Sequence, residues 1–193
     1  MALSSEFIDF VERWKHKADS YSEQTDQDVF DHFFTLFVVF NRLYSEATFV
    51  LHRKKSLELK EDRFHDYKAA TSYVLDYLSS NYYLHLLEDD NETKEALKTL
   101  SELIENCTFH IKLNMVTGAI QPAEDEKLFK SLVSKCKNTR ATAILGALYS
   151  VRCNMFHGNK EFAPIQKTLL KPLICILQKT IDIIYNKLQT EIS

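Results

Sequence analysis

Residues 30–44 read FDHFFTLFVVFNRLY. Apolar side chains in this stretch fall on almost every side of a helix, and a helix of this kind is stable when it is buried on most sides. Thr25 followed by Asp28 three positions later is typical of a capping box, which would start the helix just before this stretch. We therefore predict a central, buried helix over residues 27–52, with Asn41 and Tyr44 as its polar exceptions.

The composition predicts a single all-α domain. The chain has 193 residues, of which 45% are hydrophobic, and only three glycines and three prolines. A chain of this length can bury a large core, and it has too few turn residues for an all-β protein. We predict that residues 1–193 form one up-and-down bundle of about six or seven mostly antiparallel helices.

Apolar spacing and capping residues predict the remaining helices. They are expected over residues 5–18, 62–87 with a break near Ser80 and Asn81, 92–106, 122–135, 140–156 and 161–190. Pro172 should kink or break the last helix, because proline lacks a backbone donor. Phe109, Ile111, Leu113 and Met115 alternate with polar residues, which predicts one short extended or hairpin excursion near residues 108–120.

The sequence does not read as that of a secreted or membrane protein. The N-terminal segment carries acidic residues and has no uninterrupted apolar core, and no apolar run reaches the roughly 18 residues of a membrane span. The four cysteines are widely spaced among apolar neighbours, which is typical of reduced thiols in a core. We expect a soluble, cytoplasmic protein without membrane association, bound metal or cofactor.

Basic residues are concentrated toward the C-terminus. Between residues 127 and 171, nine lysines and arginines accompany one acidic residue, Glu161, although the whole chain has a net charge of -3. This distribution favours a locally basic surface that could attract a polyanion. Scattered, solvated lysines on helix faces are the alternative.

The segment RCNMFHGNK, residues 152–160, brings candidate chemistry to a helix end. Arg152 and His157 are five positions apart, and Asn154 lies on the same helix face as His157. Histidine titrates near neutrality and can act as a base or an acid, while the arginine fork matches phosphate oxygens. The spacing alone is weak support. In the structural alternative, Arg152 pairs with an acid across the bundle and His157 caps the helix.

In its context, RCNMFHG resembles the R-x(4-6)-H motif of the HEPN superfamily, since it ends the penultimate helix of an all-α chain. A second resemblance is an FN..Y element in an early phenylalanine-rich helix, matched by Phe40, Asn41 and Tyr44. The chain departs from the commonest form of the motif, because Cys153 stands where a polar residue usually follows the arginine. The polar residue of the motif therefore comes one position later than usual, at Asn154, so this departure argues against an auxiliary role for Asn154.

The resemblance implies a metal-independent endoribonuclease with Arg152 and His157 as its catalytic pair. It also implies RNA as the substrate. It further implies a homodimer in which the two motifs share one cleft, so that both copies contribute proton-transfer groups. Many members of the superfamily are toxins or defence effectors, restrained by an antitoxin that is commonly a small nucleotidyltransferase. The candidate auxiliary or RNA-binding residues are Asn154, Tyr149, Lys160, Arg140, Asn41 and Tyr44. The alternative function is a non-catalytic binding or adaptor module of the same fold.

Other motifs give less support. His65 lies at helical spacing from Asp62 and Asp66, but a solvated charged turn explains these residues better than a metal site. The sequence contains no GxxxxGK[ST], GxGxxG or GxSxG pattern, so nothing local favours a nucleoside triphosphate, a dinucleotide or a hydrolase-type nucleophile.

Overall fold

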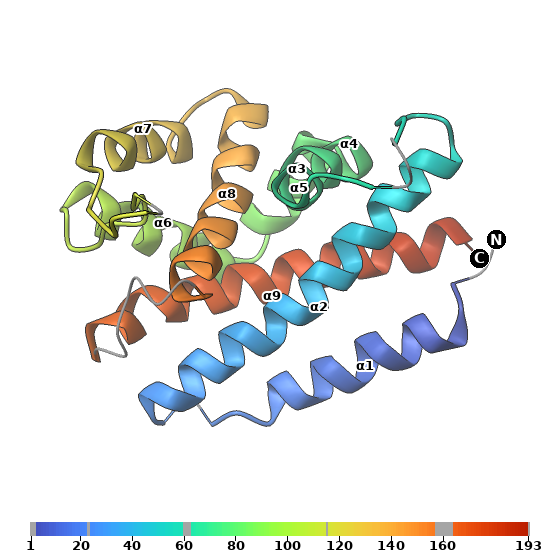
Figure 1. Cartoon of the computed structure of the whole chain (residues 1–193), viewed down its shortest axis with the longest axis horizontal. Coiled ribbons are helices and arrows are strands. Elements are labelled where there is room, and N and C mark those ends of the chain that lie inside the picture. The colour runs from blue at the N-terminus through green and yellow to red at the C-terminus, as the bar shows by residue number, and fades with distance from the viewer. Residues whose placement is uncertain (1–2, 23, 60–62, 115, 157–163, 193) are drawn as a thin grey trace.

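The computed structural model describes residues 3–22, 24–59, 63–114, 116–156 and 164–192. These residues form an all-α bundle (Figure 1), which confirms the predicted fold class. The elements are α1 (Ser5–Asp19), α2 (Asp26–Arg53), α3 (Asp66–Lys68), the π-helical turn η1 (Ala69–Tyr73), α4 (Val74–Leu78), α5 (Ser80–Glu88), α6 (Asn91–Glu105), α7 (Pro122–Leu132), α8 (Lys137–Phe156) and α9 (Pro164–Ile192).

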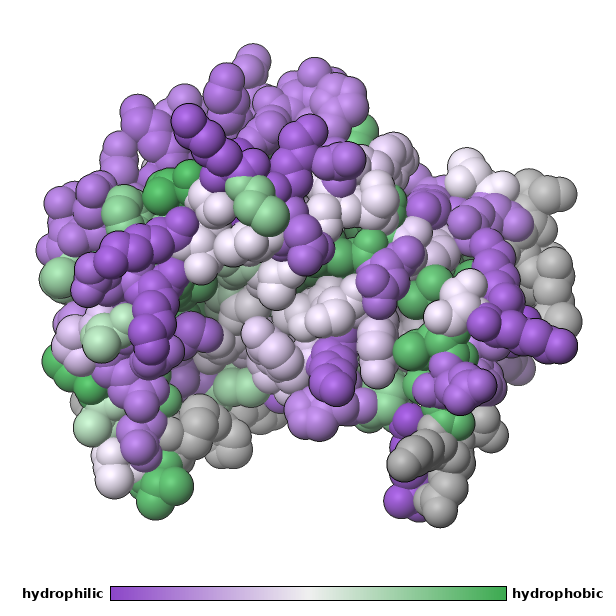
Figure 2. Space-filling view, turned by 90° about the horizontal axis from the view of Figure 1, so that it is seen from above, coloured by the Kyte–Doolittle hydropathy of each residue, from purple (hydrophilic) through white to green (hydrophobic). Residues whose placement is uncertain are grey.

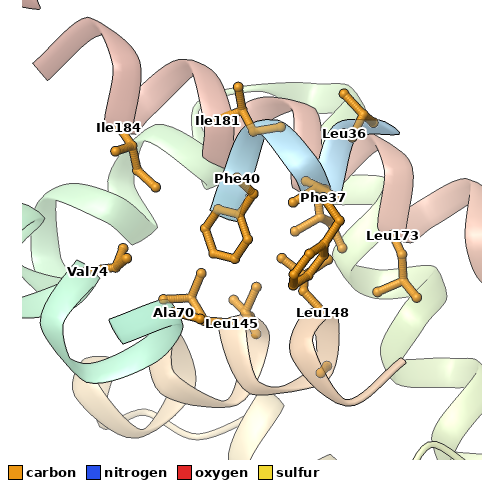
Figure 3. Close-up of a cluster of buried hydrophobic side chains, with 14 of the residues drawn as sticks. Leu36, Phe37, Phe40, Ala70, Val74, Leu145, Leu148, Leu173, Ile181 and Ile184 are labelled. Carbon is orange, nitrogen blue, oxygen red and sulfur yellow. The ribbon is translucent and has the colours of Figure 1, made fainter. Parts of the chain in front are cut away.

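Helix α2 is the centre of the bundle, as its sequence predicts. It packs against α1, α9 and the run from η1 to α4, and its capping box of Thr25 and Asp28 is present. Phe37 and Phe40 meet edge to face with their ring centres 5.4 Å apart. Figure 3 shows these rings surrounded by buried side chains from α8, α9, η1 and α4, among them Leu145, Leu148, Ile181, Ala70 and Val74.

Helices α2 and α9 run in the same direction across the molecule (Figure 1). Lys167, in the first turn of α9, lies 4.0 Å from Asp26 at the start of α2. Lys54, directly after α2, pairs with Glu191 near the end of α9 at 3.0 Å. Helix α1 runs antiparallel to α2. Exposed ion pairs of this kind contribute little free energy, so the apolar contact along α2 holds these helices together.

The expected helix boundaries hold to within a few residues, with two informative differences. The predicted break near Ser80 occurs at Ser79, so the described residues form eight helical runs when α3, η1 and α4 are counted as one. Of the predicted kink or break at Pro172, the break is wrong, because α9 continues through this residue. Leu169, Leu170 and Leu173 are buried beside this proline, and their packing offsets the lost backbone hydrogen bond.

The predicted excursion is a short hairpin between α6 and α7. Leu113 and Ile120 form an antiparallel bridge, and Gly118 adopts the positive φ of 69° that the turn requires. The buried carboxylate of Asp125, in the first turn of α7, accepts hydrogen bonds from the backbone N–H groups of Ile111 and Lys112 at 3.0 and 2.8 Å. The hairpin is therefore fastened to α7 by one side chain. Met115 lies outside the described residues.

The four cysteines are free, but two of them lie outside the core. Cys107 and Cys136 are exposed, and Cys153 and Cys175 are half-buried. The prediction of core thiols is wrong for the first two because each stands at a helix end, Cys107 after α6 and Cys136 before α8.

Among the described residues, α2 is long and apolar enough to cross a membrane by length and composition alone. Its most apolar window is 61% buried inside the bundle. Burial of this kind is what the central helix of a protein core requires.

Ser79 generates the first testable prediction. Its φ of 68° and ψ of 140° are costly for a residue with a side chain, at roughly 1–3 kcal/mol. Its hydroxyl caps α5 by accepting from the Tyr82 N–H at 3.3 Å, yet replacing a serine cap with glycine costs only a few tenths of a kcal/mol. Ser79→Gly should therefore raise the free energy of unfolding by about 1 kcal/mol, measured by urea denaturation. Ser79→Ala loses the cap and keeps the strain, so it should be less stable than wild type. Equal destabilisation of both variants would contradict this account.

Candidate functional site

Arg152 lies near the C-terminal end of α8, where the side chains of that helix meet those of α2. Its guanidinium carbon is 5.5 Å from the centre of the Phe37 ring, a distance at which a cation and an aromatic face attract each other. Arg152, Asn41 and Trp14 line a cavity of about 240 Å³ between α1, α2 and α8. Two residues that the sequence selects from separate motifs, Arg152 and Asn41, thus share one cavity.

A single carboxylate connects the two candidate tyrosines. The Tyr44 hydroxyl donates to Oδ1 of Asp66 at 2.5 Å, and the Tyr149 hydroxyl donates to Oδ2 at 2.8 Å. Tyr44 comes from α2 and Tyr149 from α8, so Asp66 joins these helices to α3. We call these three residues the tyrosine–aspartate cluster.

Asp66 is the residue that sequence reasoning missed. The prediction that Asp66 lies in a solvated charged turn is wrong, since both of its carboxylate oxygens accept hydrogen bonds from tyrosines. The first contact spans 22 positions and the second 83, so local spacing gave no signal of either.

The cluster lies within the electrostatic influence of Arg152. Burial, together with the bond to Asp66 and its negative charge, raises the pKa of Tyr44 and of Tyr149 well above the ordinary tyrosine value. The positive charge of Arg152 acts on both hydroxyls in the opposite direction, lowering each pKa by a smaller amount. Both tyrosines therefore remain protonated donors near Arg152 at neutral pH.

Asn154 faces the hairpin. Its side chain is 3% exposed, and its Nδ2 donates to the Ile111 carbonyl at 2.7 Å. In this arrangement the amide holds the hairpin against α8 and does not meet solvent.

Arg140 is also occupied, at the opposite end of α8. Its guanidinium forms an ion pair with Glu88 of α5, and it lines a different cavity beside α6. His157 and Lys160 lie outside the described residues. The structure thus brings together Arg152, Asn41, Tyr44 and Tyr149, and it separates Arg140 from them.

The basic segment is partly neutralised by two acids of α7 and by one acid of α5. Lys127 and Lys130 pair with Glu124 and Glu126, each at 2.6 Å, and Arg140 pairs with Glu88. The net positive charge of this part of the protein is therefore smaller than the count of lysines and arginines suggests.

Within the described ranges, no group of three or more histidine, cysteine, aspartate or glutamate side chains could hold a metal ion. His65 and Asp66 do not belong to such a group, since Asp66 binds the two tyrosines.

The raised pKa of Tyr44 leads to a pH-dependent prediction. An unfolded tyrosine loses its proton near pH 10, whereas folded Tyr44 retains it. The folded state then binds more protons, so the hydrogen bond's contribution is complete below pH 10 and is lost as the pH rises further. Tyr44→Phe should be less stable than wild type at pH 8 by about 1 kcal/mol.

This stability gap should narrow between about pH 10 and pH 11. Denaturant titrations at each pH measure it, and Tyr82→Phe controls for removal of an exposed hydroxyl on α5. A gap of constant size across this pH range would refute the assignment.

Comparison of the chain with protein-family models, with curated proteins and with solved structures finds no match. The resemblance to the HEPN superfamily accordingly rests on the residues of the two motifs, and the site's geometry has to support any function by itself.

Proposed function

We propose that this protein is a metal-independent endoribonuclease of the HEPN type, with Arg152 and His157 as the catalytic pair. The observation that carries the proposal is the convergence of the two motifs in space. Arg152 of α8 and Asn41 of α2 line one cavity, while Tyr149 and Tyr44 of the same two helices bind one carboxylate.

The proposed reaction is transesterification within RNA. The 2'-oxygen bonds to the adjacent phosphorus, the bond from phosphorus to the 5'-oxygen breaks, and the products carry a 2',3'-cyclic phosphate and a 5'-hydroxyl. One group removes the proton of the 2'-hydroxyl and another supplies a proton to the leaving oxygen. Histidine suits either task, and the Arg152 guanidinium would stabilise charge on the phosphate oxygens.

A homodimer completes this proposal. One chain contributes one His157, whereas the reaction needs both a base and an acid, so a second copy facing the first would supply the missing group. Asn41, at the edge of the Arg152 cavity, is exposed and can contact the RNA backbone there. Lys160 is proposed to bind a flanking phosphate.

The tyrosine–aspartate cluster has a positioning role in this scheme. Its hydrogen bonds fix the last turns of α8 against α2, and the Phe37 ring supports the guanidinium. A catalytic group held by packed neighbours loses less freedom in the transition state. The biological role proposed is a cytoplasmic toxin or defence effector with an antitoxin partner of the nucleotidyltransferase type.

The second candidate is a non-catalytic binding or adaptor module. It is favoured by the use of the side chains of Asn154, Tyr44 and Tyr149 in internal hydrogen bonds. In this role Arg152 would contribute to a binding surface without any chemistry.

Cleavage of RNA separates the two candidates. Wild-type protein with a labelled single-stranded RNA in excess EDTA should yield 2',3'-cyclic phosphate ends and leave the all-deoxy oligonucleotide intact. His157→Ala should reduce the rate by roughly 10²-fold or more, and Arg152→Gln by a similar factor. Arg53→Gln, an exposed arginine paired with Glu46 at 2.7 Å, is the matched control and should retain full activity. Folded wild-type protein that cleaves no better than His157→Ala would favour the binding module.

A further inference from the structure

A second concave region lies along α8, beside the Arg152 cavity. Two cavities of about 420 and 370 Å³ are both lined by Tyr67 and Lys112. We call the two together the α8 groove; its walls include Leu128, Thr142, Gly146 and Ser150. Figure 2, a view from above, shows weakly polar and apolar side chains in the middle of this side of the molecule and hydrophilic ones around them.

Lys112 places a positive charge where the two cavities meet. Its ammonium donates to the Ser150 hydroxyl at 2.9 Å. Its backbone N–H donates to Asp125 at 2.8 Å, and its carbonyl accepts from the Gln121 N–H at 2.9 Å. The hairpin thus presents Lys112 to the groove from a fixed backbone.

The acids near Lys112 already have partners. Asp125 accepts from two backbone N–H groups and lies 3.0 Å from His110 Nδ1, while Glu124 pairs with Lys127. Burial lowers the pKa of the Lys112 ammonium, and the two nearby carboxylates only partly oppose this. An ammonium has three donors, so Lys112 can bind an anion in addition to Ser150.

Tyr67 gives the groove an aromatic wall. Its side chain is 39% exposed, and its ring meets Tyr149 edge to face with centres 5.3 Å apart. The neighbouring Asp66 is held by its two tyrosines, and the π-helical turn directly follows. Turns of this kind are frequent at functional sites.

Gly146 lets the Tyr67 ring approach α8. A Cβ at this position would lie 3.3 Å from the Tyr67 hydroxyl. A larger side chain at residue 146 would therefore meet the aromatic wall and fill the floor of the groove.

We propose that the α8 groove binds one nucleotide, with the base stacked on Tyr67 and the phosphate at Lys112. An exposed aromatic ring combined with a cation is the arrangement that binds single-stranded nucleic acid, and each cavity has the size of a small-ligand site. The inference rests on the proposed function in that RNA is the expected source of the nucleotide. A free mononucleotide is the other source of the same chemistry.

Two packed aromatic rings lie between the groove and the Arg152 cavity. Tyr149 lines the groove, and its ring contacts Phe37 with centres 6.3 Å apart. Arg152 lies over that same Phe37 ring.

Binding can be tested without cleavage. A fluorescent 2'-O-methyl hexanucleotide, which has no free 2'-hydroxyl, and adenosine 5'-monophosphate are titrated against folded wild-type protein and variants. Tyr67→Ala should weaken binding by roughly tenfold or more, because it removes the stacking surface, and Lys112→Gln should weaken it and reduce its dependence on salt. Tyr67→Phe keeps the ring and should bind like wild type. Tyr82→Ala removes a tyrosine of similar exposure, 43%, from α5 and should also be unaffected.

A further variant, Gly146→Leu, keeps Tyr67 and Lys112 but should block binding by filling the groove. Loss in these three groove variants, with binding kept in both controls, would support the site. Binding of the monophosphate would identify a free nucleotide as a ligand, and binding of the hexanucleotide alone would identify RNA. Absence of wild-type binding to either probe, or unchanged binding in Tyr67→Ala and Lys112→Gln, would overturn the inference. Cleavage of ordinary RNA is measured separately, so the nuclease and the groove can fail independently.

Discussion

The burial of α2 on nearly every side is the constraint on which the rest of the structure depends. A helix with apolar residues all round must be covered by several neighbours, and α1, α9, η1 and α4 cover it here. Phe40 is fully buried. Truncating such a ring to alanine typically costs about 3–5 kcal/mol, far more than an exposed ion pair between these helices contributes. Helix arrangement in this protein therefore follows from the apolar surface of α2.

This constraint also places the candidate site. Phe37 and Phe40 of α2 meet Leu148 and its neighbours on α8 (Figure 3). Asn41 comes one helical turn after Phe37, and Arg152 comes one helical turn after Leu148. The core contact and the mainly apolar Arg152 cavity are thus consecutive parts of one helix crossing. Polar groups near such a crossing need hydrogen-bond partners, which the tyrosine–aspartate cluster provides. The site is supported by the same packing that holds the fold together.

The sequence predicts the features that depend on neighbouring residues. The central helix, its capping box at Thr25, the break next to Ser80 and the hairpin before Pro122 all follow from local spacing or turn chemistry. The continuation of α9 through Pro172 does not follow from local spacing, because tertiary packing outweighs the local effect of proline. The partners of Asp66 and the direction of Lys112 were equally hidden, since both depend on contacts between distant parts of the chain. Arg152 and Asn41 could be selected from motifs, but their shared cavity could be seen only in the fold.

The internal hydrogen bonds of Tyr44, Tyr149 and Asp66 bear on how Arg152 could act. Each oxygen of the Asp66 carboxylate accepts a tyrosine hydroxyl, which reduces its capacity to accept a bidentate guanidinium fork. The two neutral donors thus attenuate the negative charge of Asp66. Because the high pKa values of both tyrosines keep these donors protonated, this effect persists throughout the neutral pH range. The half-buried Asp66 thus ties Tyr44 of α2 to Tyr149 of α8, beside the residues that carry the proposed chemistry.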